Sequence, residues 1–310
     1  MGASGFIGKN IALNFSTNKE FRVFGTYFKN KTSIQNVIMK KVNLTKKKEV
    51  DKIIKGKDIV IQAAAISSGS KNITSRPYIH VNDNAIINSM VTRSCYEFFI
   101  KHIIFFSCSI MYDSHSSKLQ KEDDLDLRKI HEKYFGAAHT KIFIEKLCEF
   151  YSKLNRNKYT VVRHSNIYGP HDKFSLQQSH ALAGIINKVS STNKSVIVWG
   201  DGNEKRDFLY ISDLINFVRV VLKKQKKNYG LYNIGSEKLV SINKLADIII
   251  KISKKKISRI NDLTIKSINT NICLDCLRAR KELGWKAKID LQDGIRKTYK
   301  WFINNKFNNS

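Results

Sequence analysis

The chain lacks the features that mark secreted, membrane-spanning and metal-clustered proteins. Its five cysteines are scattered over 310 residues and do not form a disulfide framework. Cys273 and Cys276 make one C-x-x-C pair without a second pair of ligands, so we expect no metal site there. No apolar run approaches the roughly 18 residues of a membrane helix, and no signal peptide is visible. We therefore expect no membrane partner and a cytoplasmic protein.

Acidic residues are scarce. Asp and Glu total 26 against 55 Lys and Arg, which gives a formal net charge of +29. Such a charge can indicate a nucleic-acid partner, but no recognisable DNA- or RNA-binding module and no basic stripe interleaved with aromatics accompanies it. The excess lies in short lysine clusters such as 46–48, 223–227 and 254–256. We predict no nucleic-acid partner; the positive field would attract an anionic nucleotide.

The length and the order of patterns predict an α/β protein with two lobes. Apolar residues make up 42% of the chain and aromatics 10%, enough for a large core. Strand-like and helical runs alternate over the first half of the chain. We expect strands at 22–27, 58–65, 103–107 and 159–163, and helices at 50–54, 80–99 and 137–153. This alternation predicts a doubly wound parallel sheet, with ligands at the carboxyl ends of its strands.

The chain opens on glycines spaced three apart, followed by an apolar helical pattern at 9–13. Glycine lets backbone N–H groups approach a pyrophosphate, and a helix N-terminus favours its negative charge. A purely structural turn is the alternative. The candidate cofactor contacts are Gly2, Gly5, Phe6, Ile7 and Gly8. This motif normally follows a buried first strand, and only Met1 precedes it. We therefore expect the sheet to lack its usual first strand, either because the given sequence starts late or because this copy has lost it.

The end of the expected strand at 22–27 bears on the choice of cofactor. An NAD site usually places an Asp or Glu there, to bind the ribose hydroxyls. Residues 26–31 read Thr-Tyr-Phe-Lys-Asn-Lys, without an acid. This favours the 2′-phosphate of NADP, with Lys29 as a candidate contact and NAD as the alternative cofactor. Lysines that are merely solvated are the other reading.

Motifs along almost the whole chain resemble those of extended short-chain dehydrogenase/reductases, in the nucleotide-sugar epimerase/dehydratase family. Within it, the GDP-L-fucose synthases are the most similar. The most specific motif is Asn-Ile-Tyr-Gly-Pro-His-Asp at 166–172, followed at a fixed spacing by Ser179-His180. The other motifs are the opening glycines, Ala63–Ala65, Asn82, Val198–Gly200, Arg206–Leu209, Leu283–Trp285 and Tyr299–Phe302.

The resemblance implies a fold, an activity and a set of roles. Residues 1–165 would bind NADP and residues 166–310 would form a smaller mixed α/β substrate lobe, with helix 212–222 returning to the first lobe. In the second lobe, a strand and turn at 232–235 would precede a helix at 242–252, and a further helix is expected at 291–302. Fucose synthases epimerise C3 and C5 of a GDP-linked 4-keto-6-deoxy sugar and then reduce the ketone with NADPH. Family members often form homodimers through the helices near 80–99 and 140–154.

The matched positions carry these implied roles. Ala63, Ala64, Ala65 and Ser107 would contact the cofactor, as would Lys141, which would also support catalysis. His180 would act as the acid in epimerisation. Asn166, Lys188, Trp199 and Arg206 would join His180 in binding the nucleotide sugar, the two cations at its diphosphate.

Three matched catalytic positions depart from the family pattern. The Ser/Thr position is Cys108, with Ser107 and Ser109 as neighbouring substitutes, and the family's cysteine base is replaced by Ile110. The tyrosine position is Ala137, and Tyr134 lies three residues earlier. Cys108 is either a displaced base or a small buried cysteine. The alternative function is therefore a family member that binds nucleotide sugar or NADP without turnover.

Overall fold

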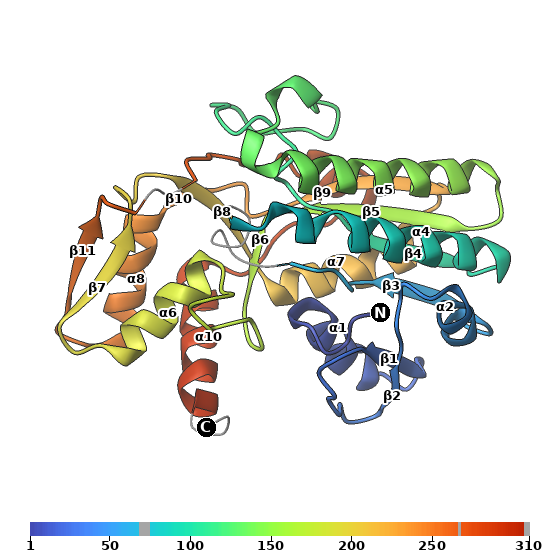
Figure 1. The fold of residues 1–310 in the computed structure, drawn as a ribbon, viewed down its shortest axis with the longest axis horizontal. Helices are drawn as coiled ribbons and strands as arrows, with labels where there is room; N and C mark the ends of the chain where they lie inside the picture. Colours follow the sequence, from blue (N-terminus) through green and yellow to red (C-terminus); the bar gives the residue numbers. More distant parts are fainter. Residues whose placement is uncertain (68–74, 266–267, 307–310) are drawn as a thin grey trace.

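The computed structural model describes residues 1–67, 75–265 and 268–306. A parallel sheet runs through the first lobe in the order β3-β4-β5-β9, and β1 pairs in parallel with β2 beside it (Figure 1). These strands are β1 (Val23–Tyr27), β2 (Val37–Lys41), β3 (Ile59–Gln62), β4 (His102–Phe106), β5 (Lys158–His164) and β9 (Tyr229–Ile234). The α/β architecture with a doubly wound parallel sheet, predicted from the alternating patterns, is confirmed.

The sheet is covered on both faces, which explains why β4 is apolar from Ile103 to Phe106. Ile104 and Phe106 belong to a core shared with α1 (Phe6–Ser16) and α7 (Ile211–Lys224). Ile103 and Phe105 belong to a second core, shared with α2 (Lys47–Ile54), α4 (Asn82–Glu97) and α5 (Phe135–Lys153). Successive strand residues point to opposite faces, so a strand between two helical layers needs apolar residues at every position.

The first three residues lie between β1 and β3. The Met1 ammonium donates to the Ile61 carbonyl at 2.7 Å, and the Ala3 N–H donates to the Thr26 carbonyl at 2.8 Å. Burial lowers the pKa of that ammonium to about 6. Two sheets are therefore joined here by single backbone contacts, rather than by a full ladder.

Two parts of the sequence interpretation need correction. Residues 232–235 were expected in the second lobe, but β9 pairs with β5 and completes the first sheet. Tyr232 and Ile234 are buried there, so the strand buries its apolar side chains in the core of the first lobe. Strand β2 was not anticipated. Its side chains are only partly buried or exposed, so it lacks the apolar run that revealed the inner strands.

The second lobe combines two small sheets with three helices (Figure 1). Strands β6 (Asn166–Tyr168), β8 (Lys205–Tyr210) and β10 (Leu239–Ser241) form one sheet, and β7 (Ser195–Trp199) pairs with β11 (Ser258–Asp262). The helices are α6 (Ala181–Ser191), α8 (Ile242–Ser253) and α10 (Leu291–Lys306). Helix α9 (Leu277–Leu283) instead contacts β9 and α7. Within the described ranges, no helix has the length and apolar character needed to cross a bilayer.

Candidate active site

The glycine turn leads directly into α1 and packs against the segment after β3. Gly2 has φ +72°, and a Cβ there would lie 2.7 Å from the Cα of Ala64. Gly5 is the N-cap residue of α1, and no side chain caps the helix. The first backbone hydrogen bond of the helix is donated by the Lys9 N–H to the Gly5 carbonyl. The N–H groups of Phe6, Ile7 and Gly8 therefore have no acceptor within the described chain, as expected for a first helical turn. They form a set of donors suited to a pyrophosphate.

The segment 63–65 is held in place by two buried asparagines of α4. The Ile66 N–H donates to Asn84 Oδ1 at 2.9 Å, while Asn84 Nδ2 donates to the Ile66 carbonyl at 3.0 Å. Gln62 Nε2 donates to Asn88 Oδ1 at 3.1 Å. The sequence reasoning missed both asparagines. Two amides four residues apart on an otherwise packed helix were the signal that could have identified them.

Lys141 and Cys108 lie together at the carboxyl end of β4. Lys141 Nζ donates to the Phe106 carbonyl at 2.8 Å and sits 4.7 Å from the centre of the Phe105 ring. Burial lowers the pKa of Lys141, and the neighbouring Cys108 and Glu145 oppose that shift. Burial raises the pKa of the Cys108 thiol, against the charge of Lys141. Cys108 is therefore a protonated thiol near pH 7, beside the Lys141 amine.

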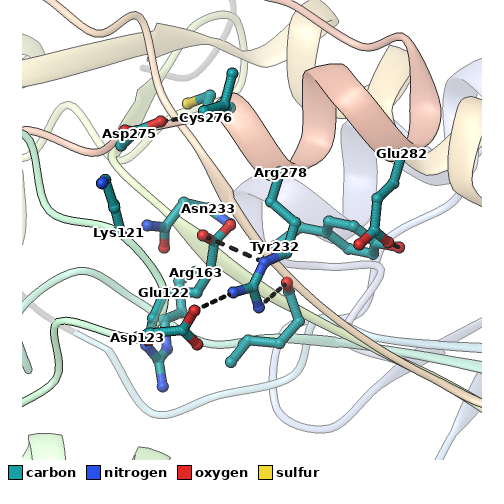
Figure 2. A network of polar contacts seen from close by, with 12 residues as sticks. Lys121, Glu122, Asp123, Arg163, Tyr232, Asn233, Asp275, Cys276, Arg278 and Glu282 are labelled. Atoms are coloured by element: carbon teal, nitrogen blue, oxygen red, sulfur yellow. Dashed lines mark hydrogen bonds and ion pairs between the residues drawn. The ribbon is translucent and has the colours of Figure 1, made fainter.

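Ser107 is engaged beneath the site in a buried polar network. Its hydroxyl donates to Glu145 Oε1 at 2.5 Å, and Glu145 pairs with Arg163 at 2.6 Å, both charged side chains being 4% exposed. Arg163 Nη1 donates to the Glu122 carbonyl at 2.9 Å. Figure 2 shows the outer part of this network, where Arg278 reaches Asp123 at 2.6 Å. The Ser107 hydroxyl is thus bonded within the protein, and Cys108 and Ser109 are the next two side chains after it.

Tyr134 enters the site from the turn before α5. It closes a short 3-10 helix, Glu132–Tyr134, and its ring is 9% exposed. Burial raises the pKa of Tyr134; the charge of Arg206 lowers it and that of Cys108 raises it. The phenol is therefore close enough to sense both groups. Ala137, at the position matched to the family tyrosine, lies within α5 and carries no hydroxyl.

Two histidines stand at the junction of the lobes. Burial lowers the pKa of His164, at the end of β5, to about 4, with further lowering by the charges of Lys141 and His180. His180 is the N-terminal cap residue of α6 and is exposed at the surface; desolvation by the protein around it and the charge of Lys173 lower its pKa. Both rings are therefore neutral near pH 7. Asn166 Nδ2, on β6, donates to the Asp207 carbonyl at 3.0 Å.

The expected substrate-binding cations occupy two places. Lys188 Nζ donates to the Ile197 carbonyl at 2.7 Å and lies 4.9 Å from the centre of the Trp199 ring. Arg206 donates to the carbonyls of Ile268 at 2.7 Å and Thr270. Lys188 and Trp199 thus lie together, whereas Arg206 binds backbone carbonyls of the segment 268–270.

The C-x-x-C pair behaves as two ordinary buried thiols. Burial raises the pKa of Cys273 to about 12, and it raises that of Cys276 well above its usual value. The described residues contain no group of three or more His, Cys, Asp or Glu side chains placed to hold a metal ion.

A cavity beside the end of β1 was not anticipated. It encloses about 420 Å³ and is lined by Phe28, Lys41, Asn43, Lys46 and Glu49. Lys29, the residue proposed from the sequence, does not line it. Its lysines come from β2 and from the turn before α2, and were missed because β2 was missed.

Comparison with known proteins gives a consistent result. The profile of the NAD dependent epimerase/dehydratase family matches residues 1–235. GDP-L-colitose synthase of Yersinia pseudotuberculosis is 27% identical over 99% of this chain and 98% of its own. GDP-L-fucose synthase of Sinorhizobium fredii is 29% identical over 86% of each chain. The crystal structure of UDP-glucose 4-epimerase with UDP-glucose, from Thermotoga maritima, superposes with a TM-score of 0.86, at 21% identity over 98% of both chains. That last likeness concerns the fold alone.

Proposed function

Because the chain belongs to the NAD dependent epimerase/dehydratase family, we propose that it is an NADP-dependent epimerase or reductase of a GDP-linked 4-keto-6-deoxy-hexose. The two curated relatives named above are synthases of GDP-L-colitose and GDP-L-fucose, which supports the substrate class. The proposal rests most on one observation: Lys141 Nζ donates to the Phe106 carbonyl at the carboxyl end of β4, and Cys108, which follows that strand, is within electrostatic range of both Lys141 and Tyr134.

The residues present fit a dinucleotide cofactor. The unpaired N–H groups at the start of α1 offer donors to a pyrophosphate, and Gly2 allows the turn to pack on Ala64. A nicotinamide cofactor, when bound, supplies or accepts a hydride. Lys141 stands at the end of the adjacent strand, where its ammonium group can bond ribose hydroxyls. The absence of an acid at 26–31 favours NADP over NAD.

The remaining chemistry belongs to side chains of the chain itself. A 4-keto group acidifies the neighbouring C–H bonds, so an acid and a base can invert those carbons through an enolate. His180 would donate the proton in this step from its imidazolium form, which the lowered pKa makes a minor form near pH 7. Tyr134, whose raised pKa keeps the phenol protonated, would protonate the oxyanion formed on reduction. The Cys108 thiol and the Ser109 hydroxyl would donate hydrogen bonds to the carbonyl oxygen.

Consumption of NADPH with GDP-4-keto-6-deoxymannose tests the proposal. Tyr134→Phe should cut the reduction rate by about 10²–10⁴-fold, as expected for a lost general acid. His180→Asn should impair epimerisation, followed by solvent deuterium exchange at the sugar, more than reduction. Lys141→Met should weaken cofactor binding, while Lys146→Ala, on the exposed side of the same helix, should not.

One observation favours a second function, binding without turnover. Ala137 has no hydroxyl at the position where the family has its tyrosine. Tyr134 lies in the 3-10 turn before α5 and not at that position. Tight NADPH binding without oxidation over a panel of keto sugars would support this alternative and defeat the enzyme proposal. An unchanged rate in Tyr134→Phe would remove that residue from the mechanism.

We also propose a homodimer that forms through α5 and the adjoining α4. The outer side of α5 exposes large apolar side chains at helical spacing, which a partner copy would cover. They are Phe135, Phe143, Phe150 and Leu154.

A further inference from the structure

Tyr134 reaches the site from a short turn and not from α5 itself. The 3-10 helix Glu132–Tyr134 is three residues long, and the Tyr134 N–H donates to the His131 carbonyl at 2.8 Å. A single 3-10 turn is a weak element, because its hydrogen-bond geometry is poor. By contrast, Ala137, at the position matched to the family tyrosine, lies within the 19-residue helix α5. The placement of the Tyr134 phenol therefore depends on the side chains that stabilise this turn.

His131 makes three contacts with the residues that follow it. Its carbonyl accepts the Tyr134 N–H, its ring Nδ1 accepts the Lys133 N–H at 3.2 Å, and its ring centre lies 5.7 Å from that of Tyr134, at 57°. The bond to Lys133 is an N-terminal cap of the turn, and it satisfies a donor that a first turn leaves without a backbone partner. Because Nδ1 is the acceptor, the hydrogen of the neutral ring is on Nε2.

The cap exists only while the imidazole ring is neutral. A protonated ring carries a hydrogen on both nitrogens and accepts no N–H. Burial and the charges of Lys133 and His115 lower the pKa of His131 from its usual value of about 6.5, while the charge of Glu132 raises it. The ring is therefore neutral near pH 7 and gains its proton at a more acidic pH.

We propose that His131 is a positioning residue for Tyr134: its neutral ring caps the turn that carries the phenol into the site, and protonation of the ring releases that turn. The inference rests on the proposed function and deepens it, because His131 acts through the proton donor of the reduction. It predicts that reduction slows in acid. Tyr134 alone would not cause this, since burial raises the pKa of its phenol, which stays protonated over the whole acid range.

The pH profile of keto-sugar reduction with NADPH tests the inference. The wild-type rate should fall by about 3- to 30-fold between about pH 7.5 and pH 5, the factor to which the loss of a helix cap corresponds. His131→Asn should retain most of the rate at the higher pH and lose this acid limb, because an asparagine oxygen caps a turn and does not titrate. His131→Phe keeps a ring beside Tyr134 without an acceptor, so its rate should be low by the same factor at every pH.

Two other histidines provide matched controls. His139, on α5, packs its ring on Phe135 outside the turn, so His139→Asn should keep both the rate and the acid limb. His115→Asn removes a charge that lowers the pKa of His131, so the acid limb should move to a higher pH. Solvent deuterium exchange at the sugar does not require Tyr134, and it should be the same in each His131 variant as in wild type. This separates a displaced phenol from a misfolded site.

A second measurement needs no turnover. In protein labelled with 3-fluorotyrosine, the Tyr134 signal can be identified by ¹⁹F NMR from its loss in Tyr134→Phe. In wild type, this signal should move at low pH toward its position in His131→Phe, with the midpoint of the acid limb, and in His131→Asn it should stay constant.

Four results would overturn the inference. They are the absence of an acid limb in wild type, its survival in His131→Asn, a wild-type rate in His131→Phe, and a Tyr134 signal that does not move with pH. The expected movement of that signal without reduction of any keto sugar would instead refute the proposed function and leave His131 as the residue that positions Tyr134.

Discussion

Replacing Arg163 by methionine should cost more stability than any other single change beneath the site. Arg163 is 3% exposed and holds the equally buried Glu145 through three N–H···O contacts of 2.6–3.2 Å. Without the guanidinium group, Glu145 keeps only the Ser107 hydroxyl as a partner. Breaking one side of such a buried pair typically costs about 3–5 kcal/mol, because a charge is left without compensation.

Equilibrium urea unfolding measures this cost directly. We expect Arg163→Met to lower the free energy of unfolding by about 3–5 kcal/mol without a change in the slope. The double variant Arg163→Met with Glu145→Leu should recover part of the lost free energy of unfolding, with a coupling energy between the two sites of at least about 2 kcal/mol. The solvated pair of Lys227 and Glu282 is the control, where Lys227→Met should cost about 1 kcal/mol or less. A loss under about 1 kcal/mol in Arg163→Met, or simple additivity in the double variant, would refute the reasoning.

Four further changes test other parts of the structure. Gly2→Ala should destabilise by more than the roughly 1 kcal/mol expected for Gly56→Ala, since both have φ +72° but only Gly2 has a neighbour in contact. Gly5→Ala should keep its stability in urea yet weaken NADP(H) at least tenfold in calorimetry, because its Cβ would stand among the phosphate donors. Burial raises the pKa of Asp207 to about 6. The free energy of unfolding of the wild type should therefore fall by up to about 3 kcal/mol relative to Asp207→Asn as the pH rises from 4 to 6. A difference that stays constant over this range in urea titrations would contradict this. Phe143→Asp should halve the mass measured by light scattering with an unchanged circular dichroism spectrum; an unaltered mass would exclude α5 from the interface.

Three strands of the central sheet could be predicted because they are apolar, and the two inner ones, β4 and β5, are also buried on both faces. The runs at 58–65, 103–107 and 159–163 are apolar and short, and each became a strand of the central sheet. The glycine turn could be predicted for a similar reason, since its spacing has few structural alternatives. Strand β2 could not, because its exposed end reads Lys40-Lys41, which resembles any lysine-rich connection in this chain.

The candidate site was only partly accessible from the sequence. The family pattern led to Lys141, His180 and Cys108, but it could not show that Ser107 is bonded to Glu145 or that Tyr134 approaches Arg206. These contacts join segments tens of residues apart, and no local pattern encodes them. The same is true of the cavity beside β1, which needs the pairing of two strands before its lysines come together.

The apolar run Ile103–Phe106 of β4 leaves its alignment with β5 undetermined by hydrophobicity alone. A register shift of one residue would move the side chains of each face of β4 to the other face, where they would also meet a hydrophobic core. Hydrogen bonds at either end prevent such a slip. At its start, His102 Nε2 meets Thr160 Oγ1 at 2.7 Å, and just past its end Ser107 bonds to Glu145. These two hydrogen bonds therefore fix the position of the end of β4, and so the position of Cys108, which follows it.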